Sequence, residues 1–277
     1  MSNNYVLVHG AGVGNWIWDG VTQALGRERG GFSVVHGSHT RSSNNVKQVI
    51  AGDLPGHGYR QGDNFTAISM EDYVEAVLDW IPPGNLKDVI LVGHDIAGLI
   101  LPQVAARLPH RIKRMVFVSA FVPQESPVLL ERLLMVNAFI SNSEKTAMGN
   151  LPITRRVPFL LRGLIKMEDK RGVRPFHKAL SKELLCNGLE SGPAGGIIAR
   201  MTAYPFWPMV TPTVMSGFGE TPSTYVVFTK DRLLPPSTQR RMSKALGDVE
   251  MVEMNGGHVS GVVMRAPEIA ELLLTYT

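Results

Sequence analysis

The sequence has a single cysteine, no long uninterrupted hydrophobic run and no block of like charges. Cys186, alone among 277 residues, cannot form an intrachain disulfide, and no metal site can be built from thiolates. The 28 Lys and Arg residues outnumber the 24 Asp and Glu residues by four and form no run of five or six. We therefore expect a protein of a reducing compartment that binds no nucleic acid.

Membrane insertion and secretion are also disfavoured. The most apolar stretch, residues 89–106, is interrupted by His94, Asp95, Pro102 and Gln103, which are costly in hydrocarbon. The first residues lack the basic segment and the apolar run of a secretory signal. Because 44% of the residues are hydrophobic and 19% are charged, the chain can form a large core. The sequence thus predicts a globular, cytoplasmic protein without a membrane span.

Short apolar runs alternate with amphipathic stretches along most of the chain. Strands are predicted at residues 5–9, 46–51, 88–92, 112–119, 224–229 and 249–253, with a short one at 32–35. Helices are predicted at residues 16–27, 70–80, 97–107, 237–246 and 267–276. This alternation is typical of the α/β class, in which helices cover both faces of a mostly parallel sheet.

The region between residues 123 and 212 breaks this pattern. It contains no strand signal, and helical patterns occur at residues 129–139, 157–166 and 176–185. We expect an inserted helical cap over residues 123–212, on an α/β core formed by residues 1–122 and 213–277. Residues 30–45, rich in Ser, Asn, Gly and His, are expected to form an irregular surface excursion.

The strongest sign of chemistry is the segment VILVGHDIAG at residues 89–98. An apolar strand runs into a turn of small residues and then into a helix, which is the setting of a nucleophile elbow. In such an elbow the central side chain projects from a strained turn, and here that residue is Asp95. The alternative interpretation is an Asp that only caps the helix.

A glycine-rich loop, HGAGVG, follows the first predicted strand. The loop at the carboxyl end of a parallel strand lies where ligands bind, and its N–H groups can face an oxyanion. Ala11 and Ile96 are the two predicted N–H donors. The loop lacks the glycine spacing of a dinucleotide-binding turn, so nucleotide binding is disfavoured.

An acid and a base follow the last two predicted strands. Asp231 comes after the strand at 224–229, and His258 comes after the strand at 249–253. A carboxylate bonded to one imidazole nitrogen fixes the tautomer and stabilises the imidazolium. We therefore predict a hydrogen bond from His258 Nδ1 to Asp231, with His258 as the base.

The chain resembles the α/β-hydrolase superfamily along nearly all its length. The segments that carry the resemblance are, in chain order, HGAGVGNWIWDGVTQAL, VIAGDLPGHG, VILVGHDIAG, YVVFTKDRLLPP and MNGGHVSG. The opening segment and the KDR…PP segment are most similar to the plant-esterase and hydroxynitrile-lyase branch, whose elbow residue is Ser. Asp at the elbow is instead typical of epoxide hydrolases and of haloalkane and haloacetate dehalogenases. The chain departs from those relatives at Ile96, where they usually have Trp or Arg.

The resemblance implies an α/β-hydrolase fold with Asp95, Asp231 and His258 as catalytic residues. An aspartate is ionised near neutral pH and needs no base to act as a nucleophile. We therefore predict an epoxide-hydrolase-like enzyme without a cofactor or a metal. Asp95 would form an alkyl ester with a small or medium apolar substrate, and His258 would activate the water that hydrolyses it.

Two other functions stay open. The first is a lyase, cyclase or cofactor-free oxygenase reaction on an esterase-like scaffold, with Asp95 and His258 as acid and base. The second is a non-catalytic ligand-binding protein. A homodimer is also left open.

Substrate-binding candidates lie near the glycine-rich loop and in the predicted cap. Trp16 is the first, and the cap offers Tyr204, Trp207 and His177, of which Tyr204 is the predicted proton donor. For the three cap residues, packing inside the cap is the alternative role. His57 and His94 are expected to be structural.

Overall fold

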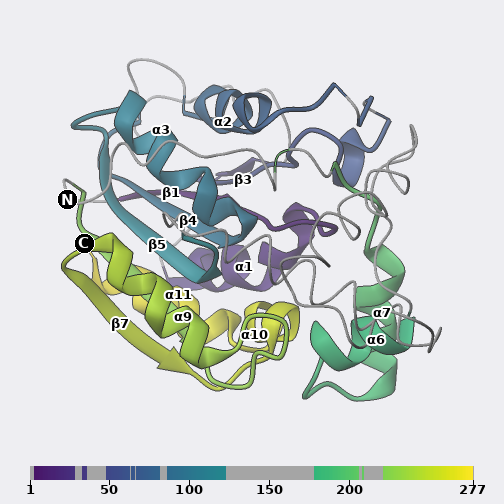
Figure 1. Ribbon diagram of the computed structural model, residues 1–277. Coiled ribbons are helices and arrows are strands. Elements are labelled where there is room, and N and C mark those ends of the chain that lie inside the picture. Colours follow the sequence, from purple (N-terminus) through teal and green to yellow (C-terminus); the bar gives the residue numbers. More distant parts are fainter. Residues whose placement is uncertain are drawn as a thin grey trace, which may run out of the picture.

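A seven-stranded parallel sheet lies at the centre of the computed structural model (Figure 1). The structure describes residues 3–28, 33–35, 48–62, 64–65, 67–81, 86–122, 178–205, 208 and 221–276. The strands are β1 (Asn4–Val8), β2 (Ser33–Val35), β3 (Gln48–Ala51), β4 (Val89–Asp95), β5 (Ile112–Ala120), β6 (Ser223–Phe228) and β7 (Val249–Met254). They are arranged in the order β2-β3-β1-β4-β5-β6-β7, and every neighbouring pair is parallel. The predicted α/β class and all seven predicted strands are confirmed.

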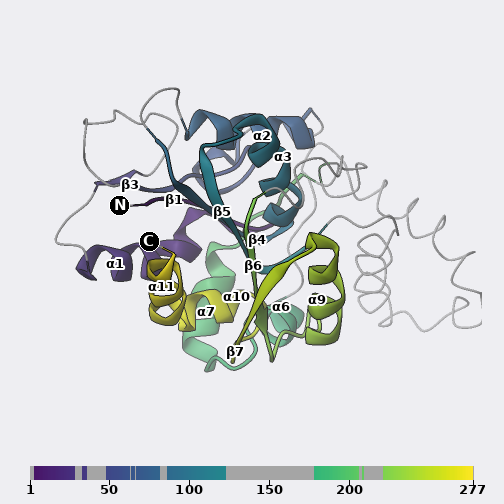
Figure 2. The same ribbon diagram turned by 90° about the vertical axis from the view of Figure 1, so that its left-hand side faces the viewer.

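Helices cover both faces of the sheet (Figure 2). One face carries α2 (Met70–Asp79), α3 (Leu101–Arg107), α9 (Pro236–Ser243) and the short helix η5 (Lys244–Leu246). The other carries η1 (Asn15–Trp18), α1 (Asp19–Glu28), α10 (His258–Met264) and α11 (Ala266–Thr275). Two further short helices, η2 (Gly58–Arg60) and η3 (Ile96–Leu99), follow β3 and β4. The five helices predicted for the core are confirmed, although α10 was not predicted.

Alternation along the strands separates two apolar layers. In β1, Val6 and Val8 pack with the α2 and α3 side, whereas Tyr5 and Leu7 pack with the α1 and α11 side. Successive side chains of a strand point to opposite faces, so a central strand covered on both sides must be apolar throughout. The edge strand β7 differs, because its residues are only partly buried or exposed. The sheet is therefore buried at its centre, where β1 and β4 end beside the candidate site.

The predicted cap lies largely outside the described residues, including the helices predicted at 129–139 and 157–166. Its described part contains α6 (Lys178–Leu184), which confirms the helix predicted at 176–185, and α7 (Ser191–Arg200), which was not predicted. Leu185, Ala194 and Ile197 of this part belong to the apolar layer on the α1 side. Among the described helices, none is long and apolar enough to cross a bilayer.

Candidate active site

Asp95 occupies a strained turn between β4 and η3. Its backbone has φ 56° and ψ −122°, a conformation that residues other than glycine rarely adopt. A side chain at Gly93 would collide with Leu101, because a Cβ there would lie 2.6 Å from Leu101 Cδ1. The strand and the helix that follow each other here approach closely, as the sequence predicts for an elbow. This strained turn places the Asp95 carboxylate at the carboxyl end of the sheet.

The Asp231 carboxylate is buried and receives three hydrogen bonds. His258 Nδ1 donates to its Oδ2 over 2.7 Å, which confirms the predicted pairing. Ser119 Oγ donates to the same oxygen over 2.5 Å, and the Leu234 N–H donates to Oδ1 over 2.7 Å. These bonds fix the carboxylate, which in turn fixes the imidazole plane and leaves Nε2 of His258 pointing at Asp95.

The two oxygens of the Asp95 carboxylate have different partners. Oδ2 accepts a hydrogen bond of 2.8 Å from the Ala11 N–H, one of the two predicted oxyanion donors. Oδ1 lies 3.5 Å from His258 Nε2, the distance of an ion pair rather than of a strong hydrogen bond. Ile96, the other predicted donor, is buried at the start of η3. The carboxylate thus lies between the glycine-rich loop and the imidazole.

Charges inside this buried site change several pKa values. Burial lowers the pKa of His258, but the charge and hydrogen bond of Asp231, together with Asp95, outweigh it and raise this pKa to about 10. Burial alone would raise the pKa of Asp95, yet the interaction with His258 holds it below its usual value. In the ligand-free state the site therefore contains a protonated imidazole between two carboxylates.

The glycine-rich loop lies directly against Asp95. A Cβ at Gly10 would lie 2.5 Å from Asp95 Cβ, so this position has room only for glycine. Asp53, which the sequence analysis missed, ties the loop to the segment after β3: it accepts hydrogen bonds from the N–H groups of Asn15 (2.7 Å) and Tyr59 (3.0 Å). Asp53 follows the strand predicted at residues 46–51, and this position is the sequence feature from which its role could have been predicted.

Buried histidines surround the carboxylate. The His94 side chain bonds the His258 carbonyl oxygen through Nε2 (3.2 Å), and burial lowers the pKa of His94 to about 3. His9 bonds the carbonyl of Gly10 through Nδ1 (2.8 Å) and accepts the Leu54 N–H at Nε2 (3.0 Å). Burial lowers the pKa of His9 to about 4. Both rings are neutral near pH 7 and hold loops in place, so neither competes with His258 as the base.

Of the predicted substrate-binding residues, Tyr204 and Trp16 lie near the glycine-rich loop. The Thr202 N–H donates to the Gly12 carbonyl (3.0 Å), and a Cβ at Gly12 would lie 3.1 Å from the Tyr204 ring. One face of the Trp16 ring is covered by the Arg200 guanidinium, 4.5 Å from its centroid. His177 and Trp207 lie outside the described residues.

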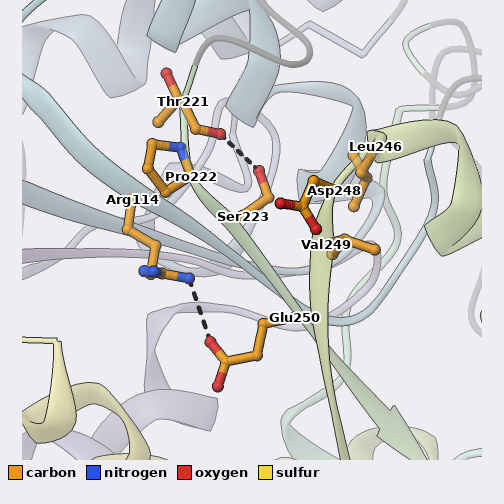
Figure 3. Close-up of a pocket in the computed structure, with 8 residues that line it drawn as sticks. All are labelled: Arg114, Thr221, Pro222, Ser223, Leu246, Asp248, Val249 and Glu250. Carbon is orange, nitrogen blue, oxygen red and sulfur yellow. Dashed lines mark hydrogen bonds and ion pairs between the residues drawn. The ribbon is translucent and has the colours of Figure 1, made fainter.

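A pocket of about 400 Å³ lies at the opposite end of the sheet (Figure 3). It is lined by Arg114, Thr221, Pro222, Ser223, Leu246, Asp248, Val249 and Glu250. Ser223 and Val249 are the first residues of β6 and β7, whereas Asp231 and His258 follow the last residues of these strands. The pocket is therefore separate from the candidate site. Within the described residues, no cluster of three His, Cys, Asp or Glu side chains could hold a metal ion.

Comparison with known proteins identifies relatives over most of the chain. A family model described as "Alpha/beta hydrolase family" matches residues 5–272. A carbendazim hydrolyzing esterase of Nocardioides sp. (strain SG-4G) is 32% identical over 130 residues, which are 47% of each chain. Putative methylesterase 14, chloroplastic, of Arabidopsis thaliana is 26% identical over 247 residues, 86% of this chain and 61% of the relative. The matches thus span about half to three fifths of the length of these curated relatives.

Solved structures share the fold. An extracellular alpha/beta-hydrolase from a Paenibacillus species, described as sharing structural and functional homology with Tobacco Salicylic Acid Binding Protein 2, has a TM-score of 0.75. It is 22% identical, over 99% of both chains. Polyneuridine aldehyde esterase has a TM-score of 0.66 at 18% identity, also over 99% of both chains. These findings confirm the predicted fold, and the curated matches confirm the resemblance to plant esterases.

Proposed function

Because the chain belongs to the alpha/beta hydrolase family, we propose that it is a hydrolase with Asp95 as its nucleophile. The substrate is a small or medium apolar molecule with an electrophilic sp³ carbon, an epoxide in the first place. The position of the Asp95 carboxylate carries the proposal: Oδ2 is bound by the Ala11 N–H at 2.8 Å, and Oδ1 faces His258 at 3.5 Å. Such a carboxylate is oriented, ionised and ready to attack.

The first step forms an ester. Oδ1 of Asp95 bonds to one epoxide carbon, the carbon–oxygen bond of the ring breaks, and its electron pair stays on the ring oxygen. Tyr204 donates the proton that this alkoxide needs. Burial and the Asp95 charge raise the pKa of Tyr204, so its hydroxyl keeps its proton until a strong base such as an alkoxide forms.

The second step cleaves the ester with water. His258 Nε2 takes a proton from the water, the hydroxide attacks the ester carbonyl, and the negative charge develops on Oδ2. That oxygen is already bound by the Ala11 N–H, with Ile96 as the second donor. The alcohol then leaves with the proton from His258 and Asp95 is released as a carboxylic acid. Asp95 passes its proton to His258 Nε2, which restores the carboxylate and the imidazolium of the resting site.

Esterification also prepares His258 for this second role. In the ligand-free protein the two carboxylates raise the pKa of His258 to about 10, which makes it a poor base. Forming the ester removes the Asp95 charge, so the pKa of His258 falls and the imidazolium can give its proton to the Tyr204 phenolate left by the first step. His258 is then neutral and Tyr204 is protonated again. Asp231 stays in place to orient the ring.

Esterase chemistry of the serine type does not fit the elbow of this chain. The curated relatives are named esterases, but position 95 carries a carboxylate instead of a hydroxyl. Attack of Asp95 on a carboxylic ester would produce a mixed anhydride, which is a poor intermediate. The hydrolytic scaffold is therefore proposed to act on an sp³ carbon.

The second candidate is acid/base catalysis of a non-hydrolytic reaction. The buried ion pair between Asp95 and His258 favours it, because a carboxylate and an imidazolium 3.5 Å apart can exchange protons with a bound substrate. This candidate needs no covalent bond to Asp95.

A search for the covalent intermediate distinguishes the two candidates. The wild type is first tested for turnover of aryl and alkyl epoxides, including styrene oxide. In His258→Ala, Asp95 should still attack the accepted epoxide, and the ester should accumulate. The protein mass should then rise by the mass of one epoxide, and digestion should place the adduct on the Asp95 peptide.

Asp95→Ala is the control and should show no adduct. Asp95→Asn is a poorer control, because an elbow Asn can be hydrolysed to Asp. An epoxide that the wild type turns over without an adduct in His258→Ala would favour the acid/base candidate. Failure of the wild type to turn over any epoxide would refute the proposed substrate class.

A further inference from the structure

Several buried polar atoms near the candidate site have no hydrogen-bond partner among the described residues, and His258 Nε2 and His94 Nδ1 are two of them. Two more lie on neighbouring side chains that the proposed mechanism does not use. They are Nε2 of His57 and the hydroxyl of Tyr73, and both side chains are fully buried. Buried polar atoms are nearly always paired, because an unpaired one has lost its hydration without compensation. Two such atoms on neighbouring side chains indicate that a partner from outside the chain is expected there.

The hydrogen bonding of His57 settles what its free nitrogen can do. Nδ1 of His57 lies 3.0 Å from the Pro55 carbonyl oxygen, which can only accept, so Nδ1 carries the proton. Burial, followed by the charge of His9, lowers the pKa of His57 to about 3, so the ring is neutral near pH 7. Nε2 is then a lone-pair acceptor and needs a donor from its partner.

The Tyr73 hydroxyl complements this acceptor. The two rings pack edge to face, with centroids 5.8 Å apart. Burial keeps the pKa of Tyr73 well above its usual value, so its hydroxyl is a proton donor at any pH of interest. A neutral hydroxyl group matches both atoms chemically, since it can donate to a lone pair such as that of His57 Nε2 and accept from a hydroxyl such as that of Tyr73. A carboxylate has no proton for Nε2, and the nearby Asp95 charge would repel it.

Tyr204 connects these atoms to the proposed nucleophile. Its ring stacks on the His57 ring with centroids 6.2 Å apart, and it also packs against Gly12 of the glycine-rich loop. His57 further contacts His9, at 5.1 Å between centroids, and the next residue, Gly10, lies directly against Asp95. Pro205, beside Tyr204 in the chain, closes over Gly56. The unpaired atoms thus lie one side-chain layer away from the reacting carboxylate.

We infer that His57 and Tyr73 form a specificity subsite that binds a hydroxyl group at the non-reacting end of the substrate. The substrate class becomes an apolar molecule with an electrophilic carbon at one end and an alcohol or phenol at the other. This assignment rests on the proposed function for the reacting end. Because both atoms are buried in the ligand-free protein, binding requires the partly exposed Tyr204 ring to move off the His57 ring while its hydroxyl stays at the reacting end.

The test measures binding of alcohols and their deoxy counterparts. Matched pairs, such as 2-naphthol with naphthalene and 1-octanol with octane, are titrated calorimetrically or by competition for a fluorescent apolar dye. The wild type should prefer the alcohols, and Tyr73→Phe should reduce that preference by about tenfold, the value of one hydrogen bond to a buried group. His57→Phe should do the same, and the double variant should lose little more, because both residues bind one group.

Tyr225→Phe is the matched control. Tyr225 is also buried, but its hydroxyl donates to the Ala120 carbonyl over 2.6 Å. Removing it should lower the urea midpoint and leave the alcohol preference unchanged. Tyr73→Phe should leave the urea midpoint unchanged or raise it, because that hydroxyl has no partner to lose.

Two results would overturn the subsite. One is the absence of any alcohol preference in the wild type, or a preference that Tyr73→Phe retains. The other is a lowered urea midpoint in Tyr73→Phe without a change in preference, which would indicate a resident water or a bond between Tyr73 and His57. The subsite and the nucleophile can fail separately. An Asp95 adduct in a protein without alcohol preference refutes the subsite alone. An alcohol preference in a protein that forms no Asp95 adduct refutes the nucleophile alone.

Discussion

Replacing Asp95 with Ser should raise the esterase activity of the protein well above that of the wild type. The elbow already holds residue 95 at φ 56°, and His258 Nε2, oriented by Asp231, already faces its side chain. A serine hydroxyl there has a base and an orienting acid in chain order, as in the serine hydrolases of this fold. The substitution also releases the Ala11 N–H, which now binds Asp95 Oδ2 at 2.8 Å, to bind the oxyanion of an ester.

The expected gain follows from these two changes. Asp95→Ala frees the same oxyanion donor but has no nucleophile, so the ratio of the two rates measures the serine hydroxyl alone. Loss of a triad serine costs roughly 10⁶ in kcat, so Asp95→Ser should hydrolyse esters at least about 100-fold faster than Asp95→Ala even in a site not selected for serine. Loss of the Asp95 charge also removes one of the groups that raise the pKa of His258 to about 10. The new activity should therefore be present near neutral pH.

The assay is hydrolysis of p-nitrophenyl acetate and butyrate by the wild type, Asp95→Ser and Asp95→Ala, with circular dichroism as the check on folding. A burst of one p-nitrophenol per site would identify the acyl-enzyme. A folded Asp95→Ser protein that is no faster than Asp95→Ala would refute the reasoning, since it would mean that residue 95 and His258 are not placed for proton transfer.

Other substitutions test the supporting groups. Asp231→Asn should lower the kcat for epoxides by about 10³–10⁴-fold, because the imidazole loses its orienting acid. Ser119→Ala removes only one donor to Asp231 and should lower kcat by less than about tenfold. Equal losses in kcat would contradict the assigned roles. Gly10→Ala should lower kcat by about 100-fold and also lower the thermal midpoint, since its Cβ would lie 2.5 Å from Asp95 Cβ and push the carboxylate off the Ala11 N–H. Full activity at an unchanged midpoint would show that this contact is dispensable. Acid should unfold the protein steeply, because His9, His57 and His94 have pKa values lowered to about 4, 3 and 3 and stay neutral when folded, while His258 is protonated in both states. The three neutral histidines contribute fully to the free energy of unfolding above pH 6.5, the pKa of histidine in the unfolded chain. This contribution is lost as the pH falls, and the free energy of unfolding should decrease by about 3–4 kcal/mol per pH unit between about pH 6 and 5. Urea unfolding at a series of pH values measures the slope, and His57→Phe should reduce it by about one third.

The fold was predictable where local sequence and burial agree. Most strands of the central sheet contain a short apolar run, so their positions could be predicted from the pattern of apolar residues along the sequence. Two helices were missed because their sequences are poor helix formers. In α7 three glycines, Gly192, Gly195 and Gly196, lower the propensity, and burial of Ala194 and Ile197 stabilises the helix instead.

The helix α10 was missed for a related reason. It has only seven residues, most of them valine or glycine, and begins at His258. A Cβ at Gly261 would lie 2.6 Å from the Phe228 ring, so the helix forms by packing closely on β6. Propensity argues against such a helix, and only the tertiary contact accounts for it.

At the candidate site, the residues of reactive type could be predicted from the sequence, but their hydrogen-bond partners could not. Asp95, Asp231 and His258 each follow a predicted strand and are of a reactive type. Ser119 ends an apolar strand and looked unremarkable, because its bond to Asp231 depends on β5 lying beside β6. The free atoms of His57 and Tyr73 could not be predicted, since a missing hydrogen bond is a property of the folded chain.

The hydrogen bond between the Ala11 N–H and the Asp95 carboxylate has a pharmacological consequence. Boronic acids and phosphonates inhibit serine hydrolases by bonding to the nucleophile and placing an anionic oxygen in the oxyanion hole. Here that place is taken by an oxygen of the protein's own carboxylate, which would repel a second anion. We therefore expect the candidate site to resist boronic acids and phosphonates and expect neutral alkylating agents to be the probes suited to it.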